Sequence, residues 1–332
     1  MSKIVVVLGA GASADFGVPT LGQLFKDSQS KIYLRNNAWL TQQLHEIFWN
    51  PRGHDLSTSE ESLTVEEMLT ILRDWELETT IPCKLNPDDL ARFRKSIYVL
   101  IYKALFEGKS SSSEHLNKLI EFCKGHFEKT TWASFNWDCI FEASYWYSSA
   151  PWGFRRSNPT LVVDIKNWYN GRASQCYLKL HGSINWWYGN GELTYLRFGS
   201  GGALERHWEN YRTAAAPSMH PVILEPSYYK YSDKLYELLE PQWHVFLQSL
   251  VEADHVLVIG YSLPNADSQA RCKMLTAFQA NPRSLWGVID PNPDTLTRYR
   301  RLFGESRLKV FTGGLVGFNN DFEQNFGQLF PT

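Results

Sequence analysis

Short apolar runs recur along the chain, each followed by a glycine or a polar residue, and this pattern predicts β-strands. The runs at 4–8 and 255–259 are almost wholly apolar, which is typical of parallel strands that helices cover on both faces. The remaining runs occupy residues 130–135, 175–180, 284–289 and 307–312.

Apolar residues at helical spacing fill the stretches between these runs. Thr64 with Glu67 three positions later is a capping-box pattern, which predicts that a helix starts there. Pro241 is expected to open a helix to Val251, because proline is favoured in the first helical turn. Other helices are predicted over residues 88–107, 113–123 (with Ser113 as its N-cap), 266–280 and 294–303.

The order of these elements predicts the fold class. One strand is followed by a long helical stretch, and only then do strands alternate with helices. We therefore expect an α/β fold with a Rossmann-like, mostly parallel sheet flanked by helices and a helical insertion at about residues 28–127. Residues 186–220, rich in Gly, Trp and Tyr, predict a smaller irregular insertion that forms a flap.

Charge and cysteine usage narrow the list of partners. The net charge of −2 and the scattered Lys and Arg do not favour direct nucleic-acid binding. No apolar stretch is long enough for a secretory signal or a membrane span, so a cytoplasmic protein without a membrane partner is expected. The cysteines are isolated and no Cys-x-x-Cys pair occurs, so no metal site is expected.

A glycine-rich turn follows the first strand. Gly9-Ala10-Gly11-Ala12-Ser13-Ala14 satisfies the G-x-G-x-x-G/A form of dinucleotide-binding proteins. In such a turn Gly9 permits the tight bend, Gly11 lets the backbone approach a pyrophosphate, and the next helix directs free N–H groups at the phosphates. The alternative is a glycine turn that binds nothing.

Two familiar enzyme classes fit the sequence poorly. A dehydrogenase needs a second strand ending in an acidic residue, and residues 21–25 before Asp27 have a helical pattern instead. Gly260-Tyr261-Ser262-Leu263-Pro264 resembles a nucleophile elbow, but Pro264 replaces the last glycine and no histidine follows His255. Ser262 is better interpreted as a hydroxyl that contacts a cofactor phosphate or ribose.

Polar clusters follow five of the predicted strands directly. In an open parallel sheet the carboxyl ends of the strands share one edge, where ligands bind. The sequence therefore predicts one site built from these clusters, which are Gly9 with Gly11, Asn136-Trp137-Asp138, His181-Gly182, Gly260-Tyr261-Ser262 and Asp290.

In their order and spacing these motifs resemble the sirtuin family over most of the chain. The turn at Gly9 with Gly17-Val18-Pro19 is similar to the family's opening, and Phe135-Asn136-Trp137-Asp138 is similar to its N-x-D element on the ribose. Lys179-Leu180-His181-Gly182-Ser183 resembles its catalytic His-Gly turn. Gly260-Tyr261-Ser262 and Val288-Ile289-Asp290 resemble its adenosine-side contacts.

The resemblance implies one sirtuin-like NAD-binding domain over residues 1–332 that uses NAD as its substrate. His181 is the expected catalytic base, Asn136 orients water or ribose, and Asp138 either contacts the ribose or only fixes its loop. The expected NAD-binding residues are Gly9, Ala10, Gly11, Ser13, Pro19, Asn136, Asp138, Gly260, Ser262 and Asp290. Gly313 is a further expected cofactor contact.

Several aromatic residues near these motifs have two interpretations. Trp137, Trp186, Trp187 and Tyr188 either stack on nicotinamide and exclude water, or pack the insertion against the core. Asp290 likewise either bonds the adenosine ribose or caps the helix that follows it.

The chain departs from protein-deacylating sirtuins in lacking their paired cysteines and in the residues after Pro19. These departures resemble the bacterial sirtuin-like branch that destroys NAD in anti-phage defence. An NAD hydrolase releasing nicotinamide and ADP-ribose is therefore expected, and an NAD-dependent deacylase or a non-catalytic sensor of NAD or ADP-ribose are the alternatives. Such a hydrolase needs control, so a homo-oligomer or a regulatory partner protein is expected.

Overall fold

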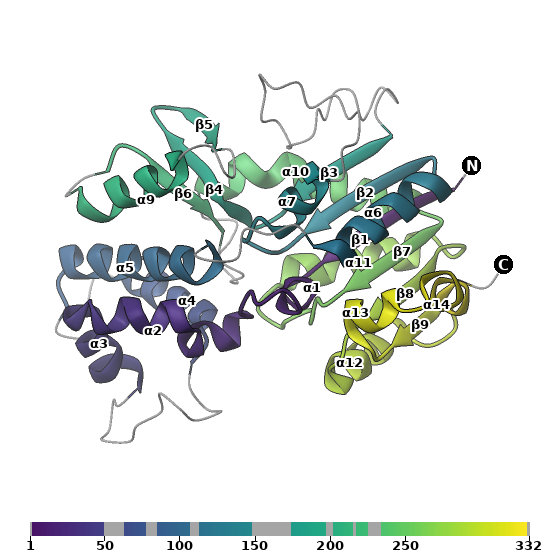
Figure 1. The fold of residues 1–332 in the computed structure, drawn as a ribbon, viewed down its shortest axis with the longest axis horizontal. Coiled ribbons are helices and arrows are strands. Elements are labelled where there is room, and N and C mark those ends of the chain that lie inside the picture. Colours follow the sequence, from purple (N-terminus) through teal and green to yellow (C-terminus); the bar gives the residue numbers. More distant parts are fainter. Residues whose placement is uncertain are drawn as a thin grey trace.

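Six parallel strands form the main sheet, in the order β3-β2-β1-β7-β8-β9 (Figure 1). They are β1 (Lys3–Leu8), β2 (Lys129–Ser134), β3 (Gln175–Lys179), β7 (His255–Ile259), β8 (Leu285–Ile289) and β9 (Leu308–Phe311). The computed structural model describes residues 2–49, 63–77, 85–106, 113–147, 174–196, 202–214, 217–224 and 234–330. The order is the dinucleotide-binding order of Rossmann folds, and it reverses between β1 and β7. All six predicted strands and the fold class are confirmed.

Alternation along β1 divides the core into two apolar clusters. Ile4, Val6 and Leu8 face one cluster, whereas Val5 and Val7 face the other. Successive side chains of a strand point to opposite faces of the sheet. The side chains of β1 on both faces are apolar because helices cover both faces, as the continuous apolar run predicts.

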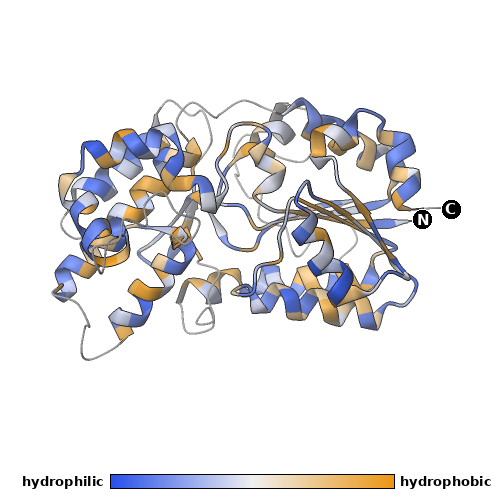
Figure 2. Cartoon of the chain, turned by 90° about the horizontal axis from the view of Figure 1, so that it is seen from below, coloured by the Kyte–Doolittle hydropathy of each residue, from blue (hydrophilic) through white to orange (hydrophobic). Residues whose placement is uncertain are grey.

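The two helical layers come from different parts of the chain. Figure 2 shows the sheet between them, with apolar helix faces turned towards it. One layer contains α10 (Lys234–Glu252), α11 (Ser268–Ala280) and α12 (Pro293–Phe303). The other contains α6 (Glu114–His126), α7 (Ile140–Tyr147), α13 (Gly314–Asn319) and α14 (Phe322–Leu329).

The helical insertion divides into two parts. α6 packs with α7 and α13 on the sheet, as a crossover helix does. The helices before it form a separate lobe beside the sheet, on the left in Figure 1. That lobe contains α2 (Ser28–Arg35), α3 (Ala38–Leu44), a π-helical turn (His45–Trp49), α4 (Val65–Leu77) and α5 (Pro87–Phe106), which also packs against α9 (Ala203–Thr213).

Two of the predicted helix starts are confirmed in atomic detail. The Thr64 backbone N–H donates to Glu67 Oε2 at 2.7 Å, and the Glu67 N–H donates to Thr64 Oγ1 at 3.3 Å. Ser113 Oγ accepts from the Leu116 N–H at 3.0 Å. These side chains satisfy backbone donors that a helix start otherwise leaves unpaired.

The predicted start at Pro241 is wrong. α10 begins at Lys234, and Pro241 lies inside it. Leu239 and Trp243 flank the proline and are fully buried, so one apolar face continues past it. The packing of that face on the sheet holds the helix together, although proline removes one backbone hydrogen bond.

Residues 186–220 are more regular than predicted. They contain the second half of β4 (Gly182–Gly189), all of β5 (Glu192–Tyr195), α9 and the first residue of β6 (His220–Ile223), and the three strands form an antiparallel sheet. Trp186 packs on Tyr195 with ring centroids 5.1 Å apart, and Trp187 packs on Trp208 of α9 at 4.9 Å. Because both faces of β4 are buried, its sequence shows no apolar–polar alternation that would reveal the strand.

The loops after β1 and β7 pack backbone against backbone. The Gly9 N–H donates to Ile259 O and the Gly11 N–H to Gly260 O, both at 2.9 Å. Gly260 has a φ of 60°, and a Cβ atom there would overlap the backbone of Gly11 and Ala12. Glycine is thus required at position 260 for both its conformation and its contact.

We expect Gly260→Ala to destabilise the protein more than the matched variant Gly191→Ala, in the turn between β4 and β5. Gly191 has a φ of 78°, and a Cβ atom added there would have no neighbour within 4 Å, so alanine costs only the left-handed conformation, about 1–2 kcal/mol. Gly260→Ala adds a steric overlap of roughly 1–3 kcal/mol. Urea unfolding of both variants measures the difference, and equal losses would contradict the close packing of the two loops.

Candidate functional site

A cavity of about 590 Å³ opens at the carboxyl ends of the strands, around the point where the strand order reverses. Its volume lies in the range of small-molecule and cofactor sites. Loops after β1, β2, β3, β7 and β8 all contribute to its lining, as the sequence predicts. The predicted residues that line it are Ala10, Gly11, Pro19, Asn136, Asp138, His181, Gly260, Ser262 and Asp290.

The Asn136 side chain connects the loop after β2 to the glycine turn. Its Nδ2 donates to Gly9 O at 2.8 Å and to Ser13 Oγ at 3.2 Å. Gly9 and Ser13 are thus next to the cavity and hold Asn136, but they are not among its lining residues. Because both amide hydrogens are used, the side-chain orientation of Asn136 is fixed.

The glycine turn is built differently from the predicted phosphate cradle. The helix after it, α1 (Gly11–Ala14), is a single turn. The N–H groups of Gly9 and Gly11 donate to the loop after β7 and its strand, and those of Ala12, Ser13 and Ala14 donate within the turn itself. The expectation that this helix directs free N–H groups at phosphates is therefore wrong, because these donors are already bonded.

His181 lies in the turn between β3 and β4 and is buried, at 4% exposure. Its Nε2 lies 3.0 Å from Oδ2 of Asp267, a residue that is fully buried. The same oxygen accepts a hydrogen bond from the Tyr261 hydroxyl at 2.6 Å. The Phe135 and His181 rings form a T-shaped contact with centroids 5.1 Å apart, so His181 is held by a carboxylate and by packing.

Asp267 is a site residue that sequence reasoning missed. It directly precedes α11, where an aspartate is common as an N-cap. Its position therefore gives no signal of a contact with His181, and only the fold brings the two side chains together. Tyr261 is part of the predicted Gly-Tyr-Ser cluster, and burial raises the pKa of its hydroxyl, with the Asp267 charge adding to the effect.

Asp138 has a definite role in its own loop. Its Oδ1 accepts from the Ile140 N–H at 2.9 Å, which closes the turn before α7, and the residue also lines the cavity. The turn interpretation is confirmed, and the ribose contact stays a prediction.

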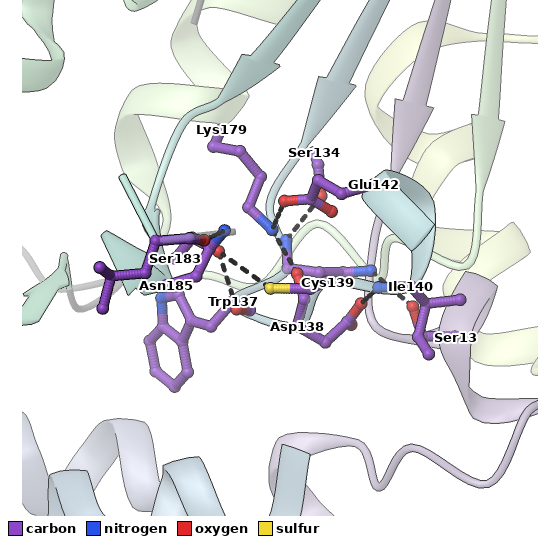
Figure 3. A network of polar contacts seen from close by, with 12 residues as sticks. Ser13, Ser134, Trp137, Asp138, Cys139, Ile140, Glu142, Lys179, Ser183 and Asn185 are labelled. Carbon is purple, nitrogen blue, oxygen red and sulfur yellow. Dashed lines mark hydrogen bonds and ion pairs between the residues drawn. The ribbon is translucent and has the colours of Figure 1, made fainter. Parts of the chain in front are cut away.

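A buried ion pair lies behind this loop (Figure 3). Lys179 Nζ is 3.2 Å from Glu142 Oε1 and also donates to the backbone oxygen of Asp138. Burial raises the pKa of the Glu142 carboxyl, against the opposite effect of Lys179. Cys139 Sγ lies 3.7 Å from Ser183 Oγ, and burial raises the pKa of this thiol, so it is a packing residue and not a nucleophile.

The residues expected to contact adenosine follow β7 and β8. Asp290 Oδ1 accepts from the Asn292 N–H at 2.8 Å, and burial raises the pKa of its carboxyl. Asn292, not Asp290, is the N-cap of α12, since its side chain accepts from the Asp294 N–H. Gly313 does not line the cavity, whereas its neighbour Gly314 does.

The four aromatic residues with two interpretations separate in the structure. Trp137 lines the cavity, and among the described residues its indole Nε1 has no hydrogen-bond partner. Trp186, Trp187 and Tyr188 lie outside the lining, in β4. Their contacts agree with the packing interpretation.

One wall of the cavity belongs to the helical lobe. Thr64 and Glu66 from the start of α4 and Leu105 from the end of α5 line it. The charged lining residues are all acidic within the described part of the chain, namely Asp15, Glu66, Asp138, Asp267 and Asp290.

The described residues contain no group of three His, Cys, Asp or Glu side chains placed to hold a metal ion. Every helix in the described ranges is too short or too polar to span a bilayer.

Comparison with solved structures finds sirtuins. A structure of Sir2Tm bound to a propionylated peptide is 10% identical with a TM-score of 0.48, over 98% of this chain and 93% of that one. A Sir2 structure with a p53 peptide and NAD⁺ is 11% identical with a TM-score of 0.47, over 98% and 93%. A mutant Sir2 homologue with 2′-O-acetyl-ADP-ribose is 14% identical with a TM-score of 0.48, over 94% and 87%.

The sequence itself identifies the family. A comparison with curated protein sequences finds no match. A family model described as a SIR2-like domain matches residues 130–310, which hold the Asn136, His181, Gly260 and Asp290 motifs. Because this match spans more than half of the 332 residues, the chain belongs to the SIR2-like domain family.

Proposed function

We propose that this chain binds NAD in the cavity and hydrolyses its nicotinamide–ribose bond, releasing nicotinamide and ADP-ribose. The observation that carries the proposal is the convergence of His181 and Asn136 on one cavity at the reversal point of a Rossmann-type sheet. Membership of the SIR2-like family supports NAD as the substrate.

The departure of nicotinamide needs no general acid from the protein. Nicotinamide departs from a cationic state as a neutral molecule, and positive charge develops on the ribose as in glycoside cleavage. The protein must hold the ribose and supply an activated oxygen. In our proposal His181 takes a proton from the attacking water or a ribose hydroxyl. Asn136, with its Nδ2 already donating, presents its amide oxygen as the acceptor that orients that group.

The charge of the cavity suits this reaction. Carboxylates are the charged groups among the described lining residues, and they stabilise a cationic ribose better than a neutral lining does. Trp137 offers its indole N–H to the bound substrate. Asp290 is the proposed acceptor for the adenosine ribose hydroxyls.

We propose hydrolysis ahead of protein deacylation because the sequence lacks the paired cysteines that the deacylating sirtuins carry. Incubation with NAD alone separates the candidates. A hydrolase releases nicotinamide without an acylated peptide, a deacylase requires that peptide, and a sensor binds NAD without forming product. The biological role that we propose is bacterial anti-phage defence, with the activity controlled by self-association or a regulatory partner, because uncontrolled loss of NAD would harm the host cell.

We expect His181→Ala to lower the rate of nicotinamide release by about 10²–10⁴-fold, the usual contribution of a general base. The matched control is His244→Ala, since His244 is an exposed histidine on α10. Chromatography of the products after incubation with NAD measures both variants. Wild-type turnover in His181→Ala would remove this residue from the mechanism.

We expect NAD to be preferred over NADP by at least about tenfold in kcat/KM, because the 2′-phosphate of NADP would face the Asp290 carboxylate. Asp290→Asn removes this repulsion and should narrow the preference, whereas Asp294→Asn, at an exposed position on α12, should not. Equal use of both dinucleotides by the wild type would show that Asp290 does not contact the ribose.

A further inference from the structure

The Asp267 side chain does not cap the helix that it precedes. Asp267 occupies the N-cap position of α11, where a carboxylate normally accepts from the first backbone N–H groups of the helix. Its side chain makes no such bond. The carboxylate instead contacts His181 at 3.0 Å and Tyr261 at 2.6 Å.

The position of this carboxylate is costly without a partner. Asp267 has no exposed surface, and a buried carboxylate is strongly disfavoured unless it is paired and hydrogen-bonded. The imidazole of His181, which contacts Asp267, is a partner that can carry a compensating positive charge.

The geometry also determines which imidazole nitrogen carries the proton. An ionised carboxylate only accepts hydrogen bonds, so the nitrogen that faces it, Nε2, must be the donor. In neutral His181 the remaining nitrogen, Nδ1, is then the unprotonated one. The Tyr261 hydroxyl stays protonated, because burial raises its pKa, and it donates to the same oxygen.

Aromatic packing restricts the partners further. The Phe135 ring stacks on Tyr261 with centroids 4.1 Å apart and an interplanar angle of 6°, and it forms a T-shaped contact with His181. The ring centroids of Trp243 in α10 and His181 lie 6.0 Å apart. The rings leave Asp267 and His181 a narrow choice of orientation, as a preorganised site requires.

We infer that Asp267 is the positioning residue of the reaction, holding Nε2–H of His181 so that Nδ1 exchanges the proton with the substrate. Tyr261 supports the carboxylate in this arrangement. The inference rests on the proposed function, since it assigns a role within the same site. As Nδ1 takes up the proton from water or ribose, Asp267 stabilises the imidazolium ion that forms.

The first test is independent of activity. ¹⁵N NMR titration of the histidine side chains, with the His181 signals assigned by their loss in His181→Ala, reports both tautomer and pKa. We expect the Nε2–H form in the wild type, and a His181 pKa lower by about one unit or more in Asp267→Asn. The other carboxylates lining the cavity, Asp15, Glu66, Asp138 and Asp290, are unchanged in this variant. An Nδ1–H tautomer, or an unchanged pKa, would overturn the inference.

The second test measures turnover. Asp267→Asn preserves the side-chain volume, and we expect kcat for nicotinamide release to fall by at least about tenfold with a much smaller change in KM. Tyr261→Phe keeps the stacked ring and should give a smaller loss of the same kind. The matched control is Asp254→Asn, at the opposite end of β7, which should keep wild-type kinetics.

The outcomes separate the two proposals. A wild-type protein that releases no nicotinamide contradicts the proposed function, while the NMR titration still decides whether Asp267 controls the protonation of His181. A rise in KM with unchanged kcat in both Asp267→Asn and Tyr261→Phe would show that the pair only shapes the binding site, and would overturn its role in positioning the base. If Asp267→Asn does not fold, Tyr261→Phe gives the same two readouts.

Discussion

The structure depends on the contact between the loops that leave β1 and β7, where two backbones lie too close for side chains to separate them. The Gly9 and Gly11 N–H groups donate across this contact. The strand order reverses here, so the helices that follow these strands leave towards opposite faces and the sheet edge stays open. The glycines therefore serve the protein's own packing first, and the ligand site exists because that packing leaves a crevice beside it.

Buried polar groups then give the crevice a fixed lining. Asn136 donates to the glycine turn, and Asp138 closes its own loop. Lys179, which pairs with Glu142, donates a hydrogen bond to the backbone oxygen of Asp138 in that loop. A buried charge pair adds little net stability when compared with apolar packing, but it strongly disfavours any arrangement that separates the charges. The arrangement of the loop after β2 is thus specified by interactions that tolerate few alternatives.

Much of this architecture can be predicted from the sequence, since hydrophobic periodicity alone locates all six parallel strands and turn residues mark the carboxyl ends where the cavity opens. The three-stranded sheet escapes the same reasoning because Trp186 and Trp187 are both buried, on opposite faces of β4. Asp267 escapes it for a different reason: its partners are brought to it only by the fold, and its local context is that of an ordinary helix start. The acceptors of the Gly9 and Gly11 N–H groups also cannot be predicted from the sequence, because they lie in and after β7 and only the fold brings them close.

The cavity is shared between two bodies of the protein, because the ends of α4 and α5 in the helical lobe complete a lining that otherwise belongs to the sheet. A ligand that touches both bodies binds most tightly to one spacing between them. By thermodynamic reciprocity, whatever holds the lobe at that spacing strengthens ligand binding, and whatever displaces the lobe weakens it by the same factor. A partner that binds the outer surface of the lobe, away from the cavity, can therefore change the affinity of the cavity for its ligand.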